Sequence, residues 1–429
     1  MTVSSAPSSV RPATRLRGRL EPPGDKSIAH RALIIGALSG GPAEVVVRSP
    51  GHDVHSTASC LRELGVSVTE RADGPLARFT LEGRPSRNAI VDCGNSGTTM
   101  RLLAGAVAAL PLRVTLDGDP SLRARPMERV ASLLRATGAE VTTTDGHAPM
   151  TIVGREGLLA TAHRLPVSSA QLLGAAALAA LGAEGESTIV SPGPTRDHTE
   201  RMLAAAGVPV RRDGLVTTVR GPARPSASSV TVPGDVSSAA PWLVAGALHP
   251  DADITITGVG LNPTRTALVE LLRRVGADLE STITNASGPE PIGELRIRGG
   301  RTLAPVRIVG DETAALIDEL PLLGVLMVVT GGELRDASEL RVKESDRISA
   351  MVAGLRSIGA SVEELPGGWR VAPGTPRHAR ITTRGDHRIA IAFAVAGLAG
   401  VASAVELDDP ACVAVSYPSF WTDLAGLAS

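Results

Sequence analysis

Apolar runs built from small residues recur along the whole chain, and each follows a polar turn rich in Ser, Gly or Thr. The runs begin near Lys26, Gly97, Ser169, Ser237, Thr313 and His387. Successive starts lie about 70 residues apart, and self-similarity at a regular period indicates an internal repeat. Because these runs have little polar face, we predict a buried helix at each of the six places.

A second pattern lies between these runs, in which an amphipathic segment ends in glycine and alternating residues follow. It is present at 61–66, 134–139, 203–208, 272–277 and 355–360. Glycine directly after an amphipathic segment is typical of a helix C-cap in the left-handed region, and alternation is typical of a strand. Each repeat is therefore predicted to be a mixed α/β module with one buried helix and one half-exposed helix. The sixth module lacks this second pattern.

Six modules with buried central helices are most simply arranged as three plus three. Turn-rich segments at 20–24 and 232–235 are the candidate crossovers between two domains. We expect a cleft between these domains, lined by the polar loops that precede the buried helices. The positive N-termini of the helices would attract anions there.

Composition and charge exclude several classes of function. A chain of 429 residues is long enough for two domains. With 43 basic and 44 acidic residues the net charge is −1, so there is no basic excess to bind nucleic acid. The N-terminal residues lack the apolar core of a secretory signal, and no apolar stretch is long enough to span a membrane. We expect a cytoplasmic protein that contacts no membrane.

The sequence offers no metal site. Cys60, Cys93 and Cys412 are an odd number without metal-ligand spacing, so we expect three buried thiols and no disulfide framework. His52 and His55 flank Asp53, but this set lacks a supporting cluster of carboxylates. We predict that Asp53 is a helix N-cap.

Lysine occurs only twice, at Lys26 and Lys343, in a chain that otherwise uses arginine. This indicates sites that require a compact, titratable ammonium, although an arginine-biased composition could also leave two lysines by accident. Near Lys26, Ser27 adds a hydroxyl and Arg31 a guanidinium, and we predict that Lys26 and Arg31 share a helical face as an anion site. Asp25 occupies a position where a Walker A loop needs glycine. An ordinary helix start with a solvated lysine is the alternative.

Four further loops carry candidate ligands for an anion at predicted helix starts. Gly97 permits close approach of the backbone, and Arg125 precedes a proline. Ser169 and Gln171 supply a hydroxyl and an amide, and Arg196 lies in a Pro/Gly-rich loop. A plain turn, a surface arginine and simple N-capping are the alternatives for these segments.

Candidate acid–base residues lie in the second half of the chain. Asp318 falls inside an apolar run, so it is either paired or a base with a perturbed pKa. Lys343 and Arg347 are predicted to share a helical face, with Glu344 pointing away from it. Arg388 follows a Gly-Asp turn and adds another guanidinium. A solvated helix surface is the alternative for 343–347.

The motifs PGDKSIAHRA, GNSGTTMR, RARPM, SSAQ, RDHTERM, LIDELP, RVKESDR and GDHRIA occur in this order over nearly the whole chain. In this set the chain resembles the 5-enolpyruvylshikimate-3-phosphate synthases (3-phosphoshikimate 1-carboxyvinyltransferases). The resemblance implies the enolpyruvyl transferase fold, an inside-out α/β barrel of two domains, each of three βαβαββ units. One domain would be 21–233, and the other 234–429 plus 1–20.

The resemblance also implies the substrates and their ligands. Shikimate-3-phosphate would be bound by Lys26, Ser27, Arg31, Ser169, Gln171, Arg196, Asp318 and Lys343. Phosphoenolpyruvate would be bound by Lys26, Gly97, Arg125, Gln171, Arg347 and Arg388. The family moves an enolpyruvyl group to the 5-hydroxyl of shikimate-3-phosphate, on the route to chorismate and the aromatic amino acids, and releases phosphate. We expect Asp318 as proton acceptor, Glu344 with Lys26 as proton donor, no metal or organic cofactor, and a monomer.

Two positions are informative when this chain is set beside the family it resembles, one that differs and one that is kept. Val415 stands where many members carry a lysine, so phosphoenolpyruvate would depend more on Arg347 and Arg388. Gly97 keeps the small residue beside which the inhibitor glyphosate fits, which predicts sensitivity.

Three competing functions have different sequence requirements. The sister enzymes that act on UDP-N-acetylglucosamine use a loop cysteine where this chain has Pro120. A non-catalytic phosphometabolite-binding protein would not need Asp318 and Glu344 together. A nucleotide kinase would need a Walker lysine and a carboxylate pair for magnesium, and we recognise neither.

Overall fold

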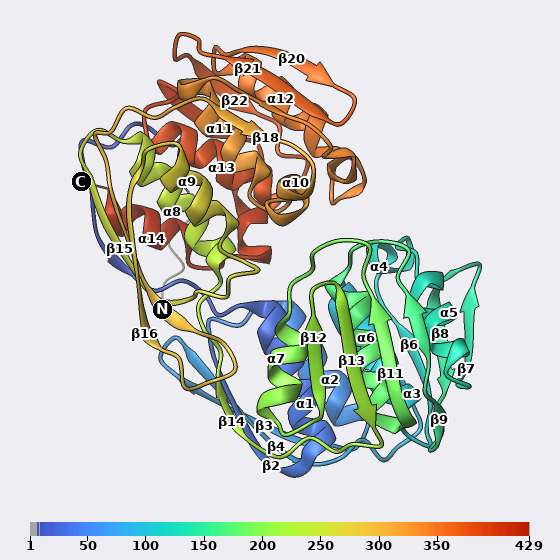
Figure 1. Cartoon of the computed structure of the whole chain (residues 1–429). Helices are drawn as coiled ribbons and strands as arrows, with labels where there is room; N and C mark the ends of the chain where they lie inside the picture. Colours follow the sequence, from blue (N-terminus) through green and yellow to red (C-terminus); the bar gives the residue numbers. More distant parts are fainter. Residues whose placement is uncertain (1–6, 8, 429) are drawn as a thin grey trace. The chain divides into compact units, whose positions relative to one another are not determined.

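The computed structural model of the chain describes residue 7 and residues 9–428. It divides into two compact units, which are coloured along the chain in Figure 1. Unit 1 comprises the described residues up to Pro23 together with Gly234–Asn285 and residues 292–428; unit 2 comprises Gly24–Pro233 and Ala286–Pro291. Residues 1–6, 8 and 429, which the sequence assigns to the second predicted domain, lie outside the described residues. Each unit has its own hydrophobic core.

Unit 2 contains three sheets with the same strand order, a parallel pair followed by two antiparallel strands. The sheets are β14(Ser229–Thr231)-β2(Gly40–Arg48)-β4(Leu76–Gly83)-β3(Ser67–Asp73), β5(Ala89–Asp92)-β6(Arg113–Asp117)-β8(His147–Val153)-β7(Glu140–Thr144), and β10(Ala162–Arg164)-β11(Ala183–Val190)-β13(Val216–Gly221)-β12(Val210–Asp213), with β9(Leu158–Leu159) also on β11. Because β14 pairs with β2, the end of the segment Gly24–Pro233 returns to the sheet with which it began.

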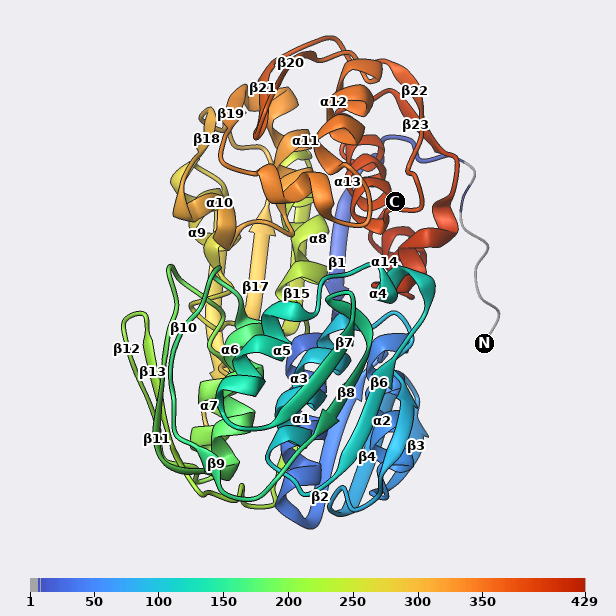
Figure 2. The ribbon, with the colours of Figure 1, turned by 90° about the vertical axis from the view of Figure 1, so that its right-hand side faces the viewer.

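Unit 1 contains two four-stranded sheets of the same order and one parallel pair. They are β1(Leu16–Leu20)-β15(Ala252–Gly260)-β17(Ile292–Arg298)-β16(Asp278–Asn285), β18(Val306–Ile308)-β19(Gly332–Leu334)-β21(Gly368–Ala372)-β20(Ser361–Leu365), and β22(His378–Ile381)-β23(Ala404–Leu407). Strand β1 runs parallel to β15, and this pairing places the N-terminal segment in unit 1. Figure 2 shows β1, β15 and β17 beside α8(Val236–Leu248).

The helices form a buried set and an amphipathic set. The buried helices are α1(Lys26–Ser39), α3(Gly97–Ala108), α6(Ala170–Ala179), α8, α11(Leu320–Thr330) and α13(His387–Leu398). The amphipathic helices are α2(His52–Glu63), α5(Glu128–Ala136), α7(His198–Ala205), α9(Ala267–Arg274) and α12(Arg347–Ser357). The short helices are α4(Pro120–Arg123), α10(Asp311–Ala315), α14(Phe420–Leu427), η1(Ala180–Gly182), η2(Ser338–Val342) and η3(Pro410–Val415).

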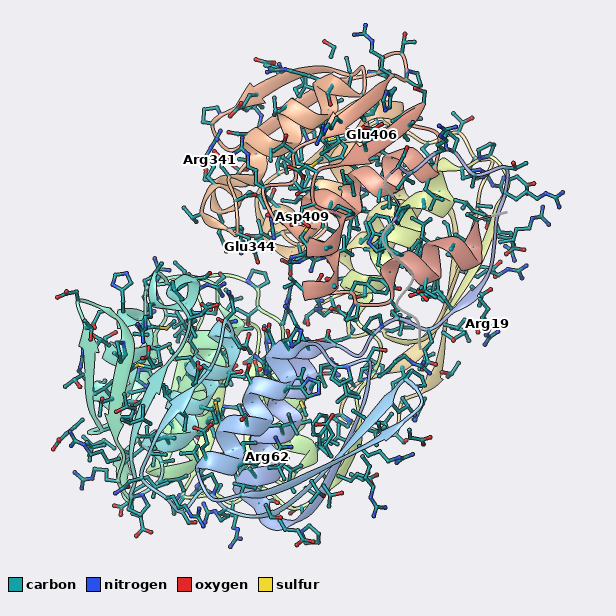
Figure 3. The ribbon with its side chains drawn as sticks, turned by 180° about the vertical axis from the view of Figure 1, so that it is seen from behind. Arg19, Arg62, Arg341, Glu344, Glu406 and Asp409 are labelled. Atoms are coloured by element: carbon teal, nitrogen blue, oxygen red, sulfur yellow. The ribbon has the colours of Figure 1, made fainter. Side chains whose placement is uncertain are left out.

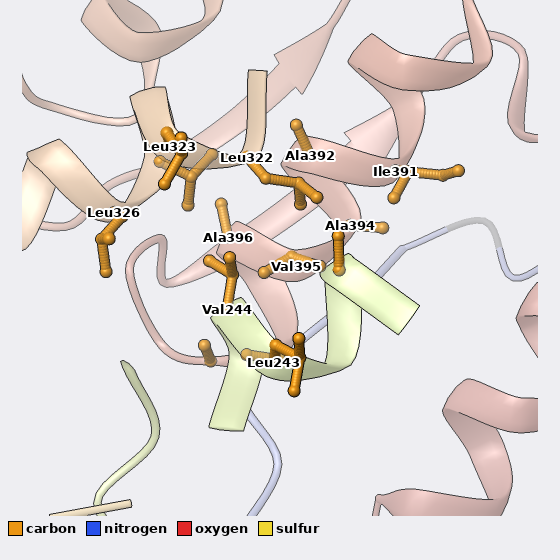
Figure 4. Close-up of a cluster of buried hydrophobic side chains, with 14 of the residues drawn as sticks. Leu243, Val244, Leu322, Leu323, Leu326, Ile391, Ala392, Ala394, Val395 and Ala396 are labelled. Carbon is orange, nitrogen blue, oxygen red and sulfur yellow. The ribbon is translucent and has the colours of Figure 1, made fainter. Parts of the chain in front are cut away.

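The buried helices pack against one another inside each unit. In unit 1, α8, α11 and α13 meet through aliphatic side chains such as Val244, Leu322 and Val395 (Figure 4). In unit 2, α1, α3 and α6 lie inside the sheets (Figure 1), and α3 contacts both α1 and α6. Since side chains from all around these helices are buried, their sequences lack a polar stripe.

The helix C-caps predicted from glycine are confirmed. The five glycines have positive φ: Gly65 (93°), Gly138 (90°), Gly207 (78°), Gly276 (100°) and Gly359 (106°). An L-residue with a side chain rarely adopts such φ, which is why glycine recurs there. A strand follows each of these glycines within a few residues.

One helix prediction is wrong about where the helix starts. The run from Thr313 is not a single helix, because α10 ends at Ala315, residues 316–319 form a turn, and α11 begins at Leu320. Pro321 is one of the first residues of α11. Proline has no amide hydrogen and is accommodated in the first turn of a helix but not in its interior, so the helix restarts there. Asp318 and Glu319 therefore lie in a turn at the start of a buried helix.

All three cysteines are free and buried, as predicted. Among the described residues no helix has the length and apolarity needed to cross a bilayer.

Candidate active site

The N-termini of α3 and α6 in unit 2 are capped by neutral side chains. Ser96 Oγ accepts a hydrogen bond from the amide of Thr99 at 3.1 Å, and Ser169 Oγ accepts one from the amide of Leu172 at 3.3 Å. The cap of α1 is instead the carboxylate of Asp25. A neutral cap leaves the positive end of the helix dipole uncompensated, so α3 and α6 favour an anion at their starts.

Two guanidiniums lie close to the backbone of Gly97, the first residue of α3. A Cβ at this position would lie 2.7 Å from Arg101 Nη1 and 3.4 Å from Arg125 Nη1. Burial, with smaller contributions from Arg125 and Arg129, lowers the pKa of Arg101 to about 10, so its side chain remains cationic at neutral pH. The missing side chain at Gly97 thus lets two positive groups approach the start of α3, where a Cβ would displace Arg101.

Gln171 connects the starts of α3 and α6. Its Oε1 accepts a hydrogen bond from Arg101 Nη1 at 2.7 Å, and its Nε2 donates one to Thr98 Oγ1 at 2.9 Å. Arg125 is held by Asn95, whose Oδ1 accepts from Arg125 Nη2 at 2.7 Å. Gly97, Arg125 and Gln171, which the sequence placed on three loops, therefore lie together in unit 2.

Arg31 connects α1 with α6 and α7. Its guanidinium donates to the carbonyl of Ala170 at 3.1 Å and to Thr199 Oγ1 at 2.7 Å. Burial lowers the pKa of Arg31 to about 10, Glu200 and Asp25 oppose that shift, and Arg196 adds to it. The effect of Arg196 places its charge in the neighbourhood of Arg31, and Ala170 places Ser169 there as well.

Lys26 points elsewhere, which corrects two predictions. Its Nζ lies 3.4 Å from Asp53 Oδ2, whereas Arg31 is directed to α6 and α7, so the two cations do not share a helical face. Five residues of helix rotate a side chain well past one full turn, which explains the divergence. Asp53 is not the N-cap of α2, because that position is Gly51 and the Asp53 carboxylate pairs with Lys26 instead. Ser27 lies beside Lys26 in the first turn of α1.

The candidate residues of unit 1 lie at or next to the N-termini of α11, α12 and α13. Arg347 is buried and donates from Nε to Asp386 Oδ2 at 2.9 Å and from Nη2 to Glu344 Oε2 at 2.5 Å. Asp386 also accepts from Ser345 Oγ at 2.9 Å and from the amide of Arg388. Burial alone would lower the pKa of Arg347, but Asp386 and Glu344 outweigh it and raise that pKa.

The helical face predicted for 343–347 is wrong. Lys343 has an extended backbone after η2, and α12 begins only at Arg347, so Glu344 lies in the intervening turn (Figure 3). Glu344 therefore contacts Arg347 and does not point away from it. The N-cap at Asp346, which accepts from the amide of Ser349, fixes where the helix starts. Lys343 Nζ pairs with Glu339 Oε1 at 2.6 Å.

The carboxylates of unit 1 influence one another electrostatically. Burial acts to raise the pKa of Glu344, but Arg347, a backbone hydrogen bond and Arg388 together lower it below its usual range. Burial and then Asp318 raise the pKa of Glu319, whose side chain accepts a hydrogen bond from Ser237 Oγ. Asp318 acts on both glutamates and Arg388 on both as well, so the four side chains belong to one charged cluster.

Several site residues were not singled out by the sequence. Arg101 lies one turn after Gly97 in the same motif, and that spacing could have identified it. Asp386 occupies the N-cap of α13 directly before His387 and Arg388, which is also a recognisable signal. The pairing of Asp53 with Lys26 joins residues far apart in the chain and leaves no local signature.

These groups suit phosphate and carboxylate ligands better than a metal. Unit 2 presents guanidiniums, an ammonium and two helix N-termini, all of which bind anions. Unit 1 adds carboxylates next to arginines, an arrangement that can hold or move a proton. Among the described residues there is no group of three His, Cys, Asp or Glu side chains that could hold a metal ion.

Comparison with known families agrees with this chemistry. The sequence model of the family described as EPSP synthase (3-phosphoshikimate 1-carboxyvinyltransferase) matches residues 10–424. The chain is 44% identical over 415 residues to the 3-phosphoshikimate 1-carboxyvinyltransferase of Acidithiobacillus ferrooxidans, which covers 96% of this chain and 95% of that protein. It is 44% identical over 426 residues to the enzyme of the same name from Gloeobacter violaceus, covering 97% of this chain and 98% of that one.

Solved structures give the same result for the fold. EPSP synthase from Acinetobacter baumannii is similar with a TM-score of 0.88 and 36% identity, covering 98% of both chains. The enolpyruvyl transferase NikO from Streptomyces tendae has a TM-score of 0.75 at 19% identity, covering 98% of this chain and 97% of that one, and this likeness concerns the fold alone.

Proposed function

The chain belongs to the EPSP synthase (3-phosphoshikimate 1-carboxyvinyltransferase) family, and we propose that it transfers the enolpyruvyl group of phosphoenolpyruvate to the 5-hydroxyl of shikimate-3-phosphate and releases phosphate. It is thus a transferase of the shikimate pathway. The observation that carries this function is the full-length match to relatives of that name, together with the cationic surroundings of Gly97.

Phosphoenolpyruvate would lie at the start of α3. Gly97, Arg125 and Gln171 bind it there with Lys26, while Arg347 and Arg388 bind it from unit 1. The closeness of Arg101 and Arg125 to Gly97 supports this assignment, because two guanidiniums can pair with a carboxylate or phosphate through several N–H groups. Val415 is exposed at the position of the family lysine and supplies no charge.

Shikimate-3-phosphate would lie beside Arg31. Its proposed ligands are Lys26, Ser27, Arg31, Ser169, Gln171 and Arg196 of unit 2, with Asp318 and Lys343 of unit 1. The convergence of Arg31, Ala170 and Thr199 supports this half of the proposal, since it places the start of α6 next to a buried guanidinium.

Asp318 and Glu344 divide the proton transfers. Asp318 accepts the proton of the 5-hydroxyl as its oxygen attacks the enol carbon, and Glu344 with Lys26 protonates the methylene carbon, which gives a tetrahedral ketal phosphate. Elimination then breaks the bond to phosphate and removes a proton from the methyl group. Glu344 has a lowered pKa without ligand, so it must gain a proton first. Anionic ligands next to Arg347 and Arg388 would raise that pKa, because they offset the two positive charges.

Phosphate release tests the function directly. We expect inorganic phosphate to appear only when the protein, shikimate-3-phosphate and phosphoenolpyruvate are all present. The same assay with UDP-N-acetylglucosamine as acceptor should give none, and release there in place of shikimate-3-phosphate would establish the sister activity. Because we propose no metal or organic cofactor, turnover should survive dialysis against a chelator.

The substitution Asp318→Asn should lower turnover about 10²- to 10⁴-fold, the range typical of a general base. Asp311→Asn is the matched control, since Asp311 is an exposed carboxylate in α10 of the same unit. Full turnover in Asp318→Asn would place the base elsewhere or favour a binding protein, provided that the circular dichroism spectrum is that of the parent.

Glyphosate should inhibit the protein in competition with phosphoenolpyruvate, because a side chain at position 97 would displace Arg101 from the start of α3, whereas Gly97 leaves Arg101 in place. Steady-state rates at millimolar glyphosate measure this, and an unchanged rate would reject the prediction.

We also propose the finer architecture of the family, two domains of three βαβαββ units each in an inside-out α/β barrel, with 21–233 as one domain and 234–429 plus 1–20 as the other. The recurring strand order of the sheets supports it. We further propose that the protein works as a monomer in the cytoplasm, which size-exclusion chromatography with light scattering and cell fractionation would test.

A further inference from the structure

A chain of buried hydrogen bonds joins three helices beneath the candidate site of unit 2. His30 Nδ1 lies 2.7 Å from Thr57 Oγ1, which lies 2.7 Å from Thr99 Oγ1, which lies 2.7 Å from Ser96 Oγ. The four residues are at most 1% exposed. We call them the His30 network. The proposed reaction does not involve these four residues. Burying a polar side chain destabilises the folded state unless the group is hydrogen-bonded, so a buried network of this kind calls for an explanation.

The direction of these hydrogen bonds can be deduced by counting protons. Thr99 donates its only hydroxyl proton to Ser96, so its oxygen must accept from Thr57. Thr57 has then used its own proton and must accept from Nδ1–H of His30. The network therefore runs one way, from His30 through Thr57 and Thr99 to Ser96, and it requires the Nδ1–H tautomer.

The surroundings of His30 agree with that tautomer. Its Nε2 finds no hydrogen-bond partner among the residues that the structure describes, and a bare lone pair is tolerated there better than an N–H. Burial lowers the pKa of His30 to about 4; Asp53 and Asp25 oppose the shift, and Lys26 and Arg31 add to it. A neutral imidazole thus lies below the ammonium of Lys26 and does not repel it.

Each end of the network lies next to a candidate substrate ligand. His30 is one helical turn after Lys26 in α1, so these two residues lie on the same face of α1. In the same way, Thr57 is one turn after Asp53 and shares its face of α2. Ser96 caps α3 and directly precedes Gly97. The pair Lys26–Asp53 thus joins α1 and α2 at their first turns, and the pair His30–Thr57 joins them one turn further along. From Thr57 the hydrogen bonds continue to the start of α3.

We propose that the His30 network positions the first turn of α3 against Lys26, so that Gly97 and the neighbouring guanidiniums are held ready for phosphoenolpyruvate. The inference rests on the proposed function only for the identity of the ligand. Its members are positioning residues, because they are buried and act through the helix starts that they connect. A hydrogen-bonded network fixes a geometry more sharply than apolar packing, since each bond has a preferred length and direction.

Thr57→Val tests the network by removing its central hydroxyl at nearly constant shape. We expect the KM for phosphoenolpyruvate to rise about tenfold, equivalent to about 1.4 kcal/mol, while the KM for shikimate-3-phosphate changes less than about twofold. Thr57→Ser restores the hydroxyl and should restore the parent values. Thr115→Val is the matched control, because Thr115 and Thr151 form a 2.8 Å hydroxyl pair between β6 and β8 in the same unit.

Parent KM values in folded Thr57→Val would overturn the proposal, as would the same defect in Thr57→Ser or an equal rise in Thr115→Val. A uniform rise in both KM values would also count against it, because general loosening of the unit would produce that pattern. Melting temperatures of all three variants show which proteins are folded when the KM values are compared.

Two measurements test the His30 network even if the parent protein proves inactive. Inactivity would contradict the proposed function but not the network. Nitrogen-15 shifts of His30 should show a proton on Nδ1 and none on Nε2. Hydrogen exchange of the amides in the first turn of α3 should quicken in Thr57→Val and stay unchanged in Thr115→Val. A proton on Nε2, or unaltered exchange in Thr57→Val, would contradict the network regardless of turnover.

Discussion

Two glutamates of unit 1 show how local surroundings set the charge of a residue. Glu344 lies beside Arg347 and near Arg388, and its pKa is lowered although burial opposes the shift. Glu319 is fully buried, and its pKa is raised by burial and by Asp318, with Arg265 and Arg388 opposing. The pKa of the same type of side chain is therefore lowered in one place and raised in the other by its neighbours.

The raised pKa of Glu319 gives a pH-dependent stability. A carboxyl whose pKa is higher in the folded state stabilises the fold below its unfolded pKa, and this contribution is lost as pH rises through the folded value. Glu319→Gln keeps an oxygen that can accept from Ser237 but cannot ionise. We expect it to match the parent in melting temperature in acid and to exceed it increasingly as pH rises. Glu363→Gln, an exposed position, is the control, and a parallel pH profile for Glu319→Gln and parent would refute the assignment.

Individual site residues were predictable where the signal was local. The sequence identified Gly97, Gln171 and Arg31 because each stands at a helix start in a polar motif, and the structure brings them to neighbouring helix N-termini. The prediction for Lys343 and Glu344 was wrong, since helical periodicity was assumed across a turn that Asp346 ends as an N-cap. The partner of Lys26 could not be foreseen, because Asp53 reaches it only through tertiary packing of α2 on α1.

At the scale of elements, the helices follow from two kinds of signal. Apolar runs located the starts of α1, α3, α6, α8 and α13 to within about one residue, and glycine located the ends of the amphipathic helices. Periodicity could not locate the break before α11, since the residues on both sides are apolar and only Pro321 marks the restart. The pairing of β1 with β15 depends on residues far apart in sequence, and no local pattern predicts it.

Gly105 permits the close approach of α3 to α6. A Cβ at Gly105 would lie 2.2 Å from the carbonyl oxygen of Ala175, which is backbone and cannot rotate away. Gly105→Ala should therefore separate the helices and destabilise the protein by about 1–3 kcal/mol, measured by urea unfolding. It should also weaken the bonds of Gln171 to Arg101 and Thr98, and so raise the KM for phosphoenolpyruvate.

Gly426 in α14 provides the matched control for that substitution. Nothing lies within 4 Å of a Cβ at this position, so Gly426→Ala should be neutral or slightly stabilising, as alanine is the better helix former. Equal stability of Gly105→Ala and Gly426→Ala would show that the helices can separate without cost.

At the scale of the whole molecule, each unit has a separate apolar core. The apolar core of unit 1 takes no residue from unit 2, and the reverse also holds. One short segment departs from this division, because Ala286–Pro291 belongs to unit 2 although it connects β16 and β17 of unit 1. Glu290 holds it there, since its buried Oε1 lies 2.7 Å from Nδ1 of His198 in α7.

Separate cores predict separate opening reactions. Leu103 is buried in α3 of unit 2 and Leu243 in α8 of unit 1, and replacing either with alanine should cost about 2–5 kcal/mol in its own core. Leu103→Ala should speed amide hydrogen exchange throughout unit 2 and leave β15, β16 and β17 protected, whereas Leu243→Ala should do the reverse. The segment 286–291 gives the sharpest readout, because chain continuity ties it to β16 and β17 while the contact of Glu290 with His198 ties it to unit 2. We expect exchange in this segment to become faster in Leu103→Ala. If exchange there instead rose in Leu243→Ala, the flanking strands would control it. A uniform rise across all residues in both variants would mean that the protein opens as one cooperative body.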